Sequence, residues 1–294
     1  ESLISTNQAI EEASQAGFVT ANGTGLSLNG QPYQFSFANQ YYLFYKSQTM
    51  VDEILQDSLA LGLNAIRTWF FCDGMYKEGV SFQPAPGIYD ESGFRNMDYL
   101  IYKASQSNLK LIIPFVNNWD DFGGINQYVK WLLGASPSYG EHDLFFTDPT
   151  IKGLFKDYIN HFLNRVNTYT GIAYKNDPTI LTWELANEPR AYTDSSGTIL
   201  NPWIDEMAQY IKEIDSNHMV SAGIEGWYGY NSGVDFVSSQ LSPYVDIATF
   251  HLFPDYYGLS SDQALQWIKD RAYDAQNILN KPVYIGEFGK TVYR

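Results

Sequence analysis

The chain has 294 residues, a formal net charge of −15 and a hydrophobic share of 45%. The acidic charge and the lack of a basic stripe in the sequence argue against nucleic acid and anionic membranes as partners, so a neutral partner is expected. No apolar run reaches the ~20 residues that a membrane-spanning helix needs. The single cysteine, Cys72, lies in the apolar run "RTWFFC" and is interpreted as a small buried hydrophobic residue.

Short apolar runs alternate with helical patterns along the chain. Strands are predicted at residues 33–39, 64–71, 110–118, 179–187, 218–225, 245–251 and 281–289. Helices are predicted at residues 50–62, 94–108, 149–170, 202–217 and 261–280, with a weak helix near 232–240. Strands that are buried on both faces and joined by helices form a parallel sheet.

These alternating units predict one α/β domain over residues 1–294, a (β/α)₈ TIM barrel with residues 1–16 as an N-terminal extension. Only seven units are found, so the eighth strand–helix unit is expected to be missing from this chain. A doubly wound open sheet is the alternative. It has less support, because no predicted strand is followed by a glycine-rich phosphate loop.

Polar residues recur at the predicted carboxyl ends of the strands, where a barrel carries its active site. Glu188 ends the fourth strand and Glu287 the seventh, so the two lie roughly across the mouth of a barrel from each other. Two carboxylates that face each other across a cleft are the catalytic groups that glycoside hydrolysis requires. We expect their carboxyl groups to be close enough for a retaining mechanism, at about 5–5.5 Å rather than the ~6.5–9.5 Å of inverting enzymes.

The neighbouring residues assign the roles of the two acids. Glu287 is predicted to be the nucleophile, because Arg67 at the end of the second strand could hold it ionised. Glu188 is predicted to be the acid, with a pKa raised by the charge of Glu287. Asn187 could donate a hydrogen bond to the 2-hydroxyl of the sugar. Alternation along the strand places Glu184 on the same face as Glu188 and opposite Asn187, and Glu184 is interpreted as a paired structural acid.

Four segments, "WELANEPR", "NNWDDFGG", "ATFHLFPD" and "YIGEFGK", resemble the strand-end motifs of family 5 glycoside hydrolases of clan A, above all the endo-β-1,4-mannanases. The similarity runs from about Gly17 to Lys290. It implies a secreted enzyme that cleaves internal bonds of mannan, glucomannan or galactomannan by double displacement, without metal or cofactor. It also implies that Glu188 is the acid/base and Glu287 the nucleophile, and that substrate is bound by Arg67, Asn187, His251, Trp119, Arg190 and Glu225.

Aromatic residues near strand ends, among them Tyr41 and Trp69, fit a cleft that stacks on sugar rings and complete the set of candidate substrate-binding residues. The sequence departs from the family pattern at Phe253, where the family has a tyrosine whose hydroxyl contacts the nucleophile. It also stops before the family's eighth strand. We therefore expect a monomer, with an associated C-terminal fragment as one way to complete the barrel.

Two other functions remain open from the sequence. One is a related β-glycanase of the same fold, either a cellulase or an exo-β-mannosidase. The other is a carbohydrate-binding barrel without catalytic activity, which the early end of the chain and Phe253 favour. The presence of both Glu188 and Glu287 opposes the second, because a binding protein has no need of both.

Overall fold

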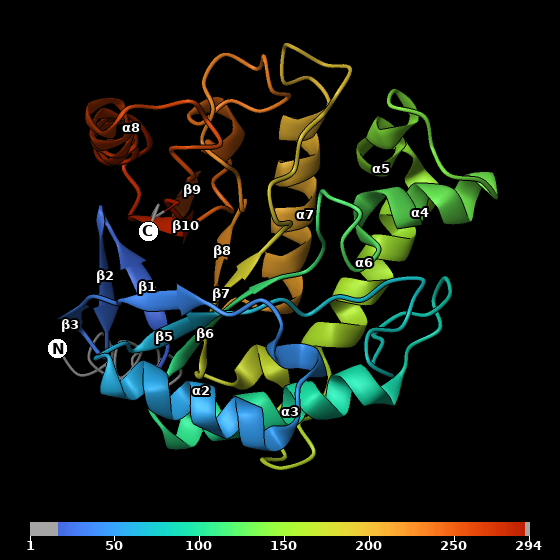
Figure 1. Cartoon of the computed structure of the whole chain (residues 1–294), viewed down its shortest axis with the longest axis vertical. Coiled ribbons are helices and arrows are strands. Elements are labelled where there is room, and N and C mark those ends of the chain that lie inside the picture. Colours follow the sequence, from blue (N-terminus) through green and yellow to red (C-terminus); the bar gives the residue numbers. More distant parts are fainter. Residues whose placement is uncertain (1–16, 292–294) are drawn as a thin grey trace, which may run out of the picture.

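The apolar runs form a barrel of parallel strands with helices outside them (Figure 1), in a computed structural model that describes residues 17–291. The barrel strands are β4 (Phe37–Asn39), β5 (Ala65–Arg67), β6 (Lys110–Pro114), β7 (Ile180–Glu184), β8 (Met219–Ser221), β9 (Ala248–Leu252) and β10 (Val283–Phe288). Strands β4 to β8 pair in chain order as one parallel sheet, and β9 and β10 form a second parallel pair. Backbone hydrogen bonds from Ile247 to Val220 and from His251 to Glu225 join the two sheets.

Helices follow most of the strands and cover the outside of the barrel. They are α2 (Gln48–Ala60), α3 (Glu91–Gln106), α4 (Gly124–Leu133), α5 (Leu144–Thr147), α6 (Pro149–Leu163), α7 (Leu200–Ile214) and α8 (Ser261–Asp274). Side chains at the N-termini fix where several of them begin: Ser47 caps α2, Asp148 caps α6, and Ser260 forms a capping box with Gln263 at α8. None of the described helices is long and apolar enough to cross a membrane.

The barrel separates two apolar layers. The interior contains one residue from each of several strands, such as Ile112 on β6, Leu181 on β7 and Met219 on β8. The larger cluster fills the space between the strands and the surrounding helices, and Cys72 is fully buried within it as predicted. Because side chains alternate along each strand, inward and outward residues of the same strand serve different layers.

A three-stranded antiparallel sheet packs against the interior layer of the barrel. It consists of β1 (Val19–Asn22), β2 (Gly25–Leu28) and β3 (Gln31–Tyr33). Val19 packs with the interior layer, and Leu26 and Leu28 lie against it. This small sheet buries residues that would otherwise face water at the N-terminal ends of the strands.

The predicted (β/α)₈ barrel is confirmed in its first seven strands over the described residues, where β10 and β4 are not paired with each other. Between β10 and β4 lies a hollow of about 740 Å³ whose walls include Phe35, Phe37, Tyr284 and Ile285. An eight-stranded barrel would have its remaining strand and helix here.

Several element predictions need correction, and the N-terminal extension predicted at residues 1–16 lies outside the described residues. The predicted strand at 33–39 is divided between β3 and β4. The helix predicted near 232–240 is wrong, since only Ser238–Gln240 form a 3₁₀ turn. The helix predicted at 149–170 ends at Leu163. The helix predicted at 261–280 is confirmed, although its last turn, Ala275–Leu279, is π-helical.

Candidate active site

Arg67, at the end of β5, organises the bottom of the site. Its guanidinium is fully buried and donates to Glu184 at 2.6 Å, to Glu287 at 2.7 Å, to Asn187 at 2.8 Å and to Asn39 at 3.3 Å. Burial alone would lower the pKa of Arg67, but the charges of Glu184 and Glu287 outweigh burial and raise it. The predicted pairing of Arg67 with Glu287 is therefore present, and Glu184 is the paired structural acid that was expected.

Asn187 and Glu184 both contact Arg67, although simple alternation would place them on opposite faces of one strand. The prediction that Glu184 and Asn187 lie on opposite faces fails because regular pairing of β7 stops at Glu184. Glu188 then adopts a left-handed backbone with φ of 57°, which turns the chain. The amide oxygen of Asn187 accepts from Arg67 and its amide nitrogen donates once, to Asn117 at 3.0 Å, which leaves one N–H for a ligand.

Glu287 lies near the end of β10, and its carboxylate accepts a hydrogen bond from Arg67. The residue before it must be small. A Cβ on Gly286 would lie 2.7 Å from Nε2 of His251, closer than side chains pack. Glycine therefore lets β10 lie against the His251 ring and brings Glu287 level with His251 in the strand register.

Glu188 is almost completely buried, and both of its carboxylate oxygens have partners. One pairs with Nδ1 of His251 at 2.7 Å, and the other accepts from Nε1 of Trp119 at 2.6 Å. Burial alone would raise the pKa of Glu188, but the bond to His251, its charge, the Trp119 bond and Arg190 together lower it. The raised pKa predicted from the charge of Glu287 is thus wrong for the free protein.

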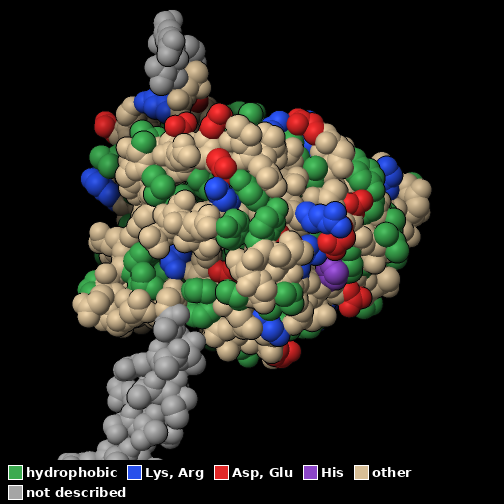
Figure 2. Space-filling model, turned by 90° about the horizontal axis from the view of Figure 1, so that it is seen from below, with side chains coloured by type: hydrophobic (Ala, Val, Ile, Leu, Met, Phe, Trp, Pro, Cys, Tyr) green, Lys and Arg blue, Asp and Glu red, His purple; other side chains and the backbone are tan. Residues whose placement is uncertain are grey.

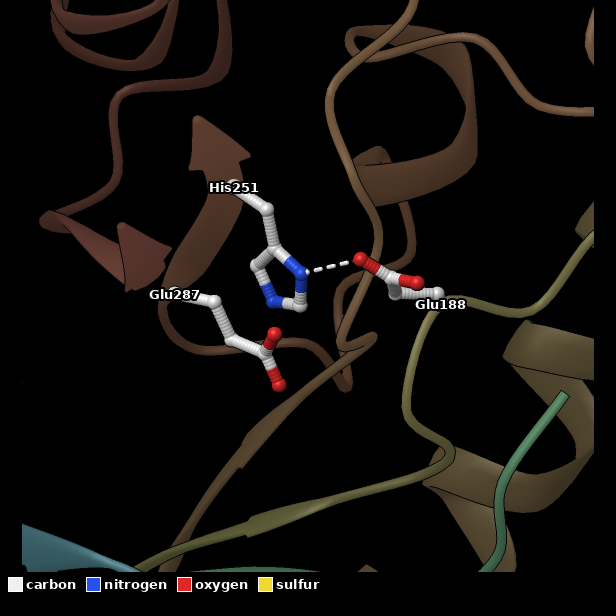
Figure 3. A group of neighbouring side chains, drawn as sticks. All are labelled: Glu188, His251 and Glu287. Carbon is white, nitrogen blue, oxygen red and sulfur yellow. Dashed lines mark hydrogen bonds and ion pairs between the residues drawn. The ribbon is translucent and has the colours of Figure 1, made fainter. Parts of the chain in front are cut away.

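His251, on β9, lies between the two acids (Figure 3), and its Nε2 atom has no partner among the described residues. Burial alone would lower the pKa of His251, but the charges of Glu287 and Glu188 and the Glu188 hydrogen bond raise it. The 2.7 Å contact thus joins a carboxylate whose pKa is lowered to an imidazole whose pKa is raised.

The two carboxylates are close to each other. One oxygen of Glu188, one ring nitrogen of His251 and one oxygen of Glu287 all lie within 4.8 Å of one another. The shortest oxygen–oxygen distance between the two acids is therefore at most 4.8 Å. The same three atoms are close enough to bind a cation together, but the hydrogen bonds of Glu188 and Arg67 already use the carboxylates.

Glu225 and Arg190 form an ion pair beside Glu188, with Arg190 donating to the Glu225 carboxylate. Burial, followed by the negative charge of Glu188, raises the pKa of Glu225 to about 7, against the lowering effect of Arg190. The guanidinium of Arg190 also lies 5.2 Å from the centre of the Trp119 ring. Three of the candidates predicted from the sequence thus form one wall next to the acid.

These groups open into a hollow of about 560 Å³, which we call the catalytic hollow. It is lined by Glu188, Glu287, Trp119, Arg190, Glu225, Trp227, Phe253, Tyr256 and Tyr257. Trp227 was missed from the sequence, although it stands two residues after Glu225 in "GIEGWYG". Phe253 lines the hollow, and of the described residues only Arg67 donates a hydrogen bond to Glu287.

Tyr41 and Trp69 are placed differently from the other candidates. Their rings lie 5.1 Å apart, and both pack near Phe122. Neither residue lines the catalytic hollow. The structure thus brings together eight of the ten candidates predicted from the sequence and leaves these two in a neighbouring aromatic cluster.

Comparison with known proteins gives consistent matches across nearly the whole described chain. The sequence pattern of a family described as "GH family 5 beta-mannosidase-like" matches residues 16–291. Mannan endo-1,4-beta-mannosidase 3 of Arabidopsis thaliana is 37% identical, over 97% of this chain and 75% of its own length.

Solved structures agree in fold. The endo-β-1,4-mannanase of Thermotoga petrophila is 39% identical with a TM-score of 0.82, over 89% of this chain and 62% of its own. The endo-1,4-β-mannanase of Rhizomucor miehei is 37% identical with a TM-score of 0.83, over 90% of this chain and 80% of its own. This chain therefore spans between about three fifths and four fifths of the relatives described here.

Proposed function

The chain belongs to the β-mannosidase-like group of glycoside hydrolase family 5, and from this premise we propose that it is an endo-β-1,4-mannanase that hydrolyses internal bonds of mannans with retention of configuration. The observation that carries the proposal is the pair Glu188 and Glu287, of which one carboxylate oxygen each lies within 4.8 Å of the other at the catalytic hollow. The relatives named above as mannan-cleaving enzymes support the choice of substrate.

In the first step, Glu287 attacks the anomeric carbon and forms a glycosyl ester as the bond to the leaving oxygen breaks. Arg67 holds the attacking carboxylate in place through its 2.7 Å hydrogen bond. The free N–H of Asn187 donates to the sugar 2-hydroxyl, a contact that strengthens at the transition state. Glu188 delivers a proton to the leaving oxygen.

The proton that Glu188 transfers comes from its hydrogen-bonded pair with His251. The lowered pKa of Glu188 and the raised pKa of His251 keep the proton on the histidine in the free protein. As negative charge develops on the leaving oxygen, the proton moves along the 2.7 Å bond to Glu188 and on to that oxygen. Formation of the ester also removes the charge of Glu287, which is one cause of the raised pKa of His251.

In the second step, water replaces the leaving group and attacks the same carbon, while Glu188 accepts its proton as a base. The ester bond to Glu287 breaks, the proton passes from Glu188 back to His251 along their hydrogen bond, and both carboxylates are regenerated. The close spacing of the carboxylates supports this two-step route, because a single displacement needs room for water between the acid and the base.

Viscosity of a galactomannan solution tests the proposal. We expect the wild-type chain to lower the viscosity faster than it releases reducing ends, because cuts inside the polymer shorten it most. Glu287→Ala should abolish the fall, and carboxymethyl cellulose should be cleaved much more slowly. Release of mannose without a fall in viscosity would indicate an exo-acting enzyme, and preferred cleavage of the cellulose derivative would indicate a cellulase.

We also propose that the enzyme works outside the cell, as a polymer substrate requires. Recovery of galactomannan-cleaving activity from the culture medium of the source, rather than from the cells, would support this location. Activity confined to the cells would contradict it.

A further inference from the structure

A second hollow of about 500 Å³, which we call the distal hollow, borders the catalytic hollow. Trp119 and Arg190 line both. Trp119 donates to the acid Glu188, and Glu287 lines only the catalytic hollow. A ligand that extends from one hollow into the other therefore passes the acid, on the side where the leaving group of the reaction departs.

The distal hollow is lined by neutral polar groups. Hydroxyl and amide side chains of Thr193, Ser195, Asn231 and Ser232 face it. Its two charged side chains already have partners within the protein. Arg190 pairs with Glu225, and the carboxylate of Asp194 accepts hydrogen bonds from its own loop, including the backbone N–H of Ile199 at 2.8 Å. This surface suits an uncharged ligand with many hydroxyl groups.

Tyr139 supplies a flat aromatic surface at this hollow. Its ring is stacked on Tyr192, with centroids 4.7 Å apart and planes 15° from parallel. Tyr192 is stacked in turn on His142 at 3.9 Å, and its hydroxyl accepts from Asn118 at 3.0 Å. His142 is itself buried and hydrogen-bonded to Asn126 at 2.8 Å.

The outermost ring of this stack is the most exposed, since 71% of Tyr139 is accessible. The three rings hold one another in register, so the open face of Tyr139 is already fixed in the free protein. Ordering a flexible aromatic side chain costs free energy on binding, and a pre-stacked one avoids that cost.

We propose that the distal hollow binds the leaving-group portion of the substrate, a neutral chain of β-linked hexopyranose units, with Tyr139 as the stacking surface for a sugar ring beyond the Arg190–Glu225 pair. The inference rests on the proposed function and extends it, because it predicts a cleft longer than the catalytic hollow. Sugar rings bind aromatic faces through their C–H groups, and the surrounding hydroxyl and amide groups take up the ring hydroxyls.

The test uses reducing-end-labelled β-1,4-manno-oligosaccharides of increasing length, with Tyr139→Ala, Tyr139→Phe and a control, Tyr273→Ala. Tyr273 is 63% exposed on α8 and lines neither hollow. Tyr139→Ala should lower kcat/KM about 3- to 10-fold for the longest oligosaccharides, the size expected for one lost aromatic contact. It should leave the shortest cleavable ones unchanged and move cleavage toward the reducing end. Tyr139→Phe and Tyr273→Ala should behave as wild type.

Other results would overturn the inference. If Tyr139→Ala cleaves long and short oligosaccharides like wild type, with the same label distribution, Tyr139 binds no substrate. An equal loss at every length would indicate a general disturbance of the fold. If the wild type cleaves no oligosaccharide, the proposed function fails instead. In that case, calorimetry with mannohexaose tests the distal hollow separately. The inference requires that Tyr139→Ala binds mannohexaose more weakly than the wild type does, and equal binding would reject it.

Discussion

Arg67 joins the nucleophile to the structural core through a single side chain. Its planar guanidinium reaches Glu184 and Glu287 in different directions, which a lysine ammonium on a flexible stem does not reproduce. Because Glu184 is fully buried, the pair is also part of the stability of the barrel. The residue therefore both positions Glu287 and neutralises a buried acid.

Replacing Arg67 with lysine should lower kcat by at least about 100-fold, the size of effect that a small misplacement of a reacting group produces. Steady-state kinetics on galactomannan measure this, with KM changing much less than kcat. Arg165→Lys is the control. Arg165 also binds two acids, Asp98 and Glu91, but none of these three residues lines the catalytic hollow. It should reduce stability and preserve kcat. A wild-type kcat in Arg67→Lys would show that Glu287 does not depend on the guanidinium.

The His251–Glu188 pair makes stability depend on pH in two directions. The raised pKa of His251 contributes stability that is complete below its ordinary pKa of 6.5 and is lost as the pH rises through its folded pKa. The lowered pKa of Glu188 contributes stability that is present above its ordinary pKa of 4.5 and is lost as the pH falls through its folded pKa. The pair is therefore most stabilising between the two ordinary pKa values, 4.5 and 6.5.

We expect the free energy of unfolding of the wild type to fall more between about pH 6 and about pH 9 than that of His251→Gln, because only the wild type loses the His251 proton. Urea unfolding at the two pH values measures the difference. His161→Gln is the control. The pKa of His161 is lowered, first by burial and then by Arg165, so it contributes no loss at high pH. Equal pH dependence in wild type and His251→Gln would contradict the protonated pair.

At the scale of elements, the site depends on how closely β10 lies against β9. Gly286→Ala would place a Cβ 2.7 Å from His251 Nε2 and 3.0 Å from Oγ1 of Thr249, both on β9. The strand must shift, so we expect a loss of about 1–3 kcal/mol in the free energy of unfolding together with most of the activity. Thermal unfolding and viscosity assays measure the two effects.

Gly153→Ala provides the matched control for that change. Gly153 is an exposed position inside α6, and a Cβ there would meet nothing within 4 Å. The same substitution should therefore stabilise the protein by about 0.5–1 kcal/mol, because glycine is unfavourable inside a helix. Wild-type activity and stability in Gly286→Ala would show that β9 and β10 are not held at this distance.

The sequence predicted the alternating strands and helices of the barrel, and it missed elements that depend on local geometry. Buried strands and amphipathic helices were predicted because their apolar residues run on, or recur regularly, over many positions. The antiparallel sheet β1–β3 was missed because its strands have three or four residues and are mostly not buried.

Most residues of the site were also predicted from the sequence, but their pKa values and some of their positions were not. Strand ends located Glu188, Glu287, Arg67 and His251, because a barrel gathers strand ends at one mouth. The lowered pKa of Glu188 was not predictable, since it follows from the His251 and Trp119 bonds that form only after a left-handed turn at Glu188. Nothing in the sequence placed Tyr41 and Trp69 outside the catalytic hollow.

For the whole molecule, the net charge of −15 determines which polymers can approach the site. Figure 2 shows charged side chains of both signs scattered over one face, without a basic patch there. A neutral polysaccharide is neither attracted nor repelled by such a surface, whereas an anionic one is repelled over roughly a Debye length.

The initial rate on neutral galactomannan should change less than about twofold between about 20 mM and about 500 mM NaCl, while carboxymethylated galactomannan should be cleaved faster as salt screens the repulsion. Reducing-end assays on the matched pair of substrates measure both. A strong salt dependence with the neutral polymer would indicate that charged groups contribute to substrate binding.

The most direct test of the account is the configuration of the first product, followed by proton NMR during early hydrolysis of a β-1,4-manno-oligosaccharide. Because one oxygen of Glu188 lies within 4.8 Å of one oxygen of Glu287, we predict that the β-anomer forms first and that the α-anomer appears only by slow mutarotation. Initial formation of the α-anomer would contradict the double displacement and the assignment of Glu287 as nucleophile.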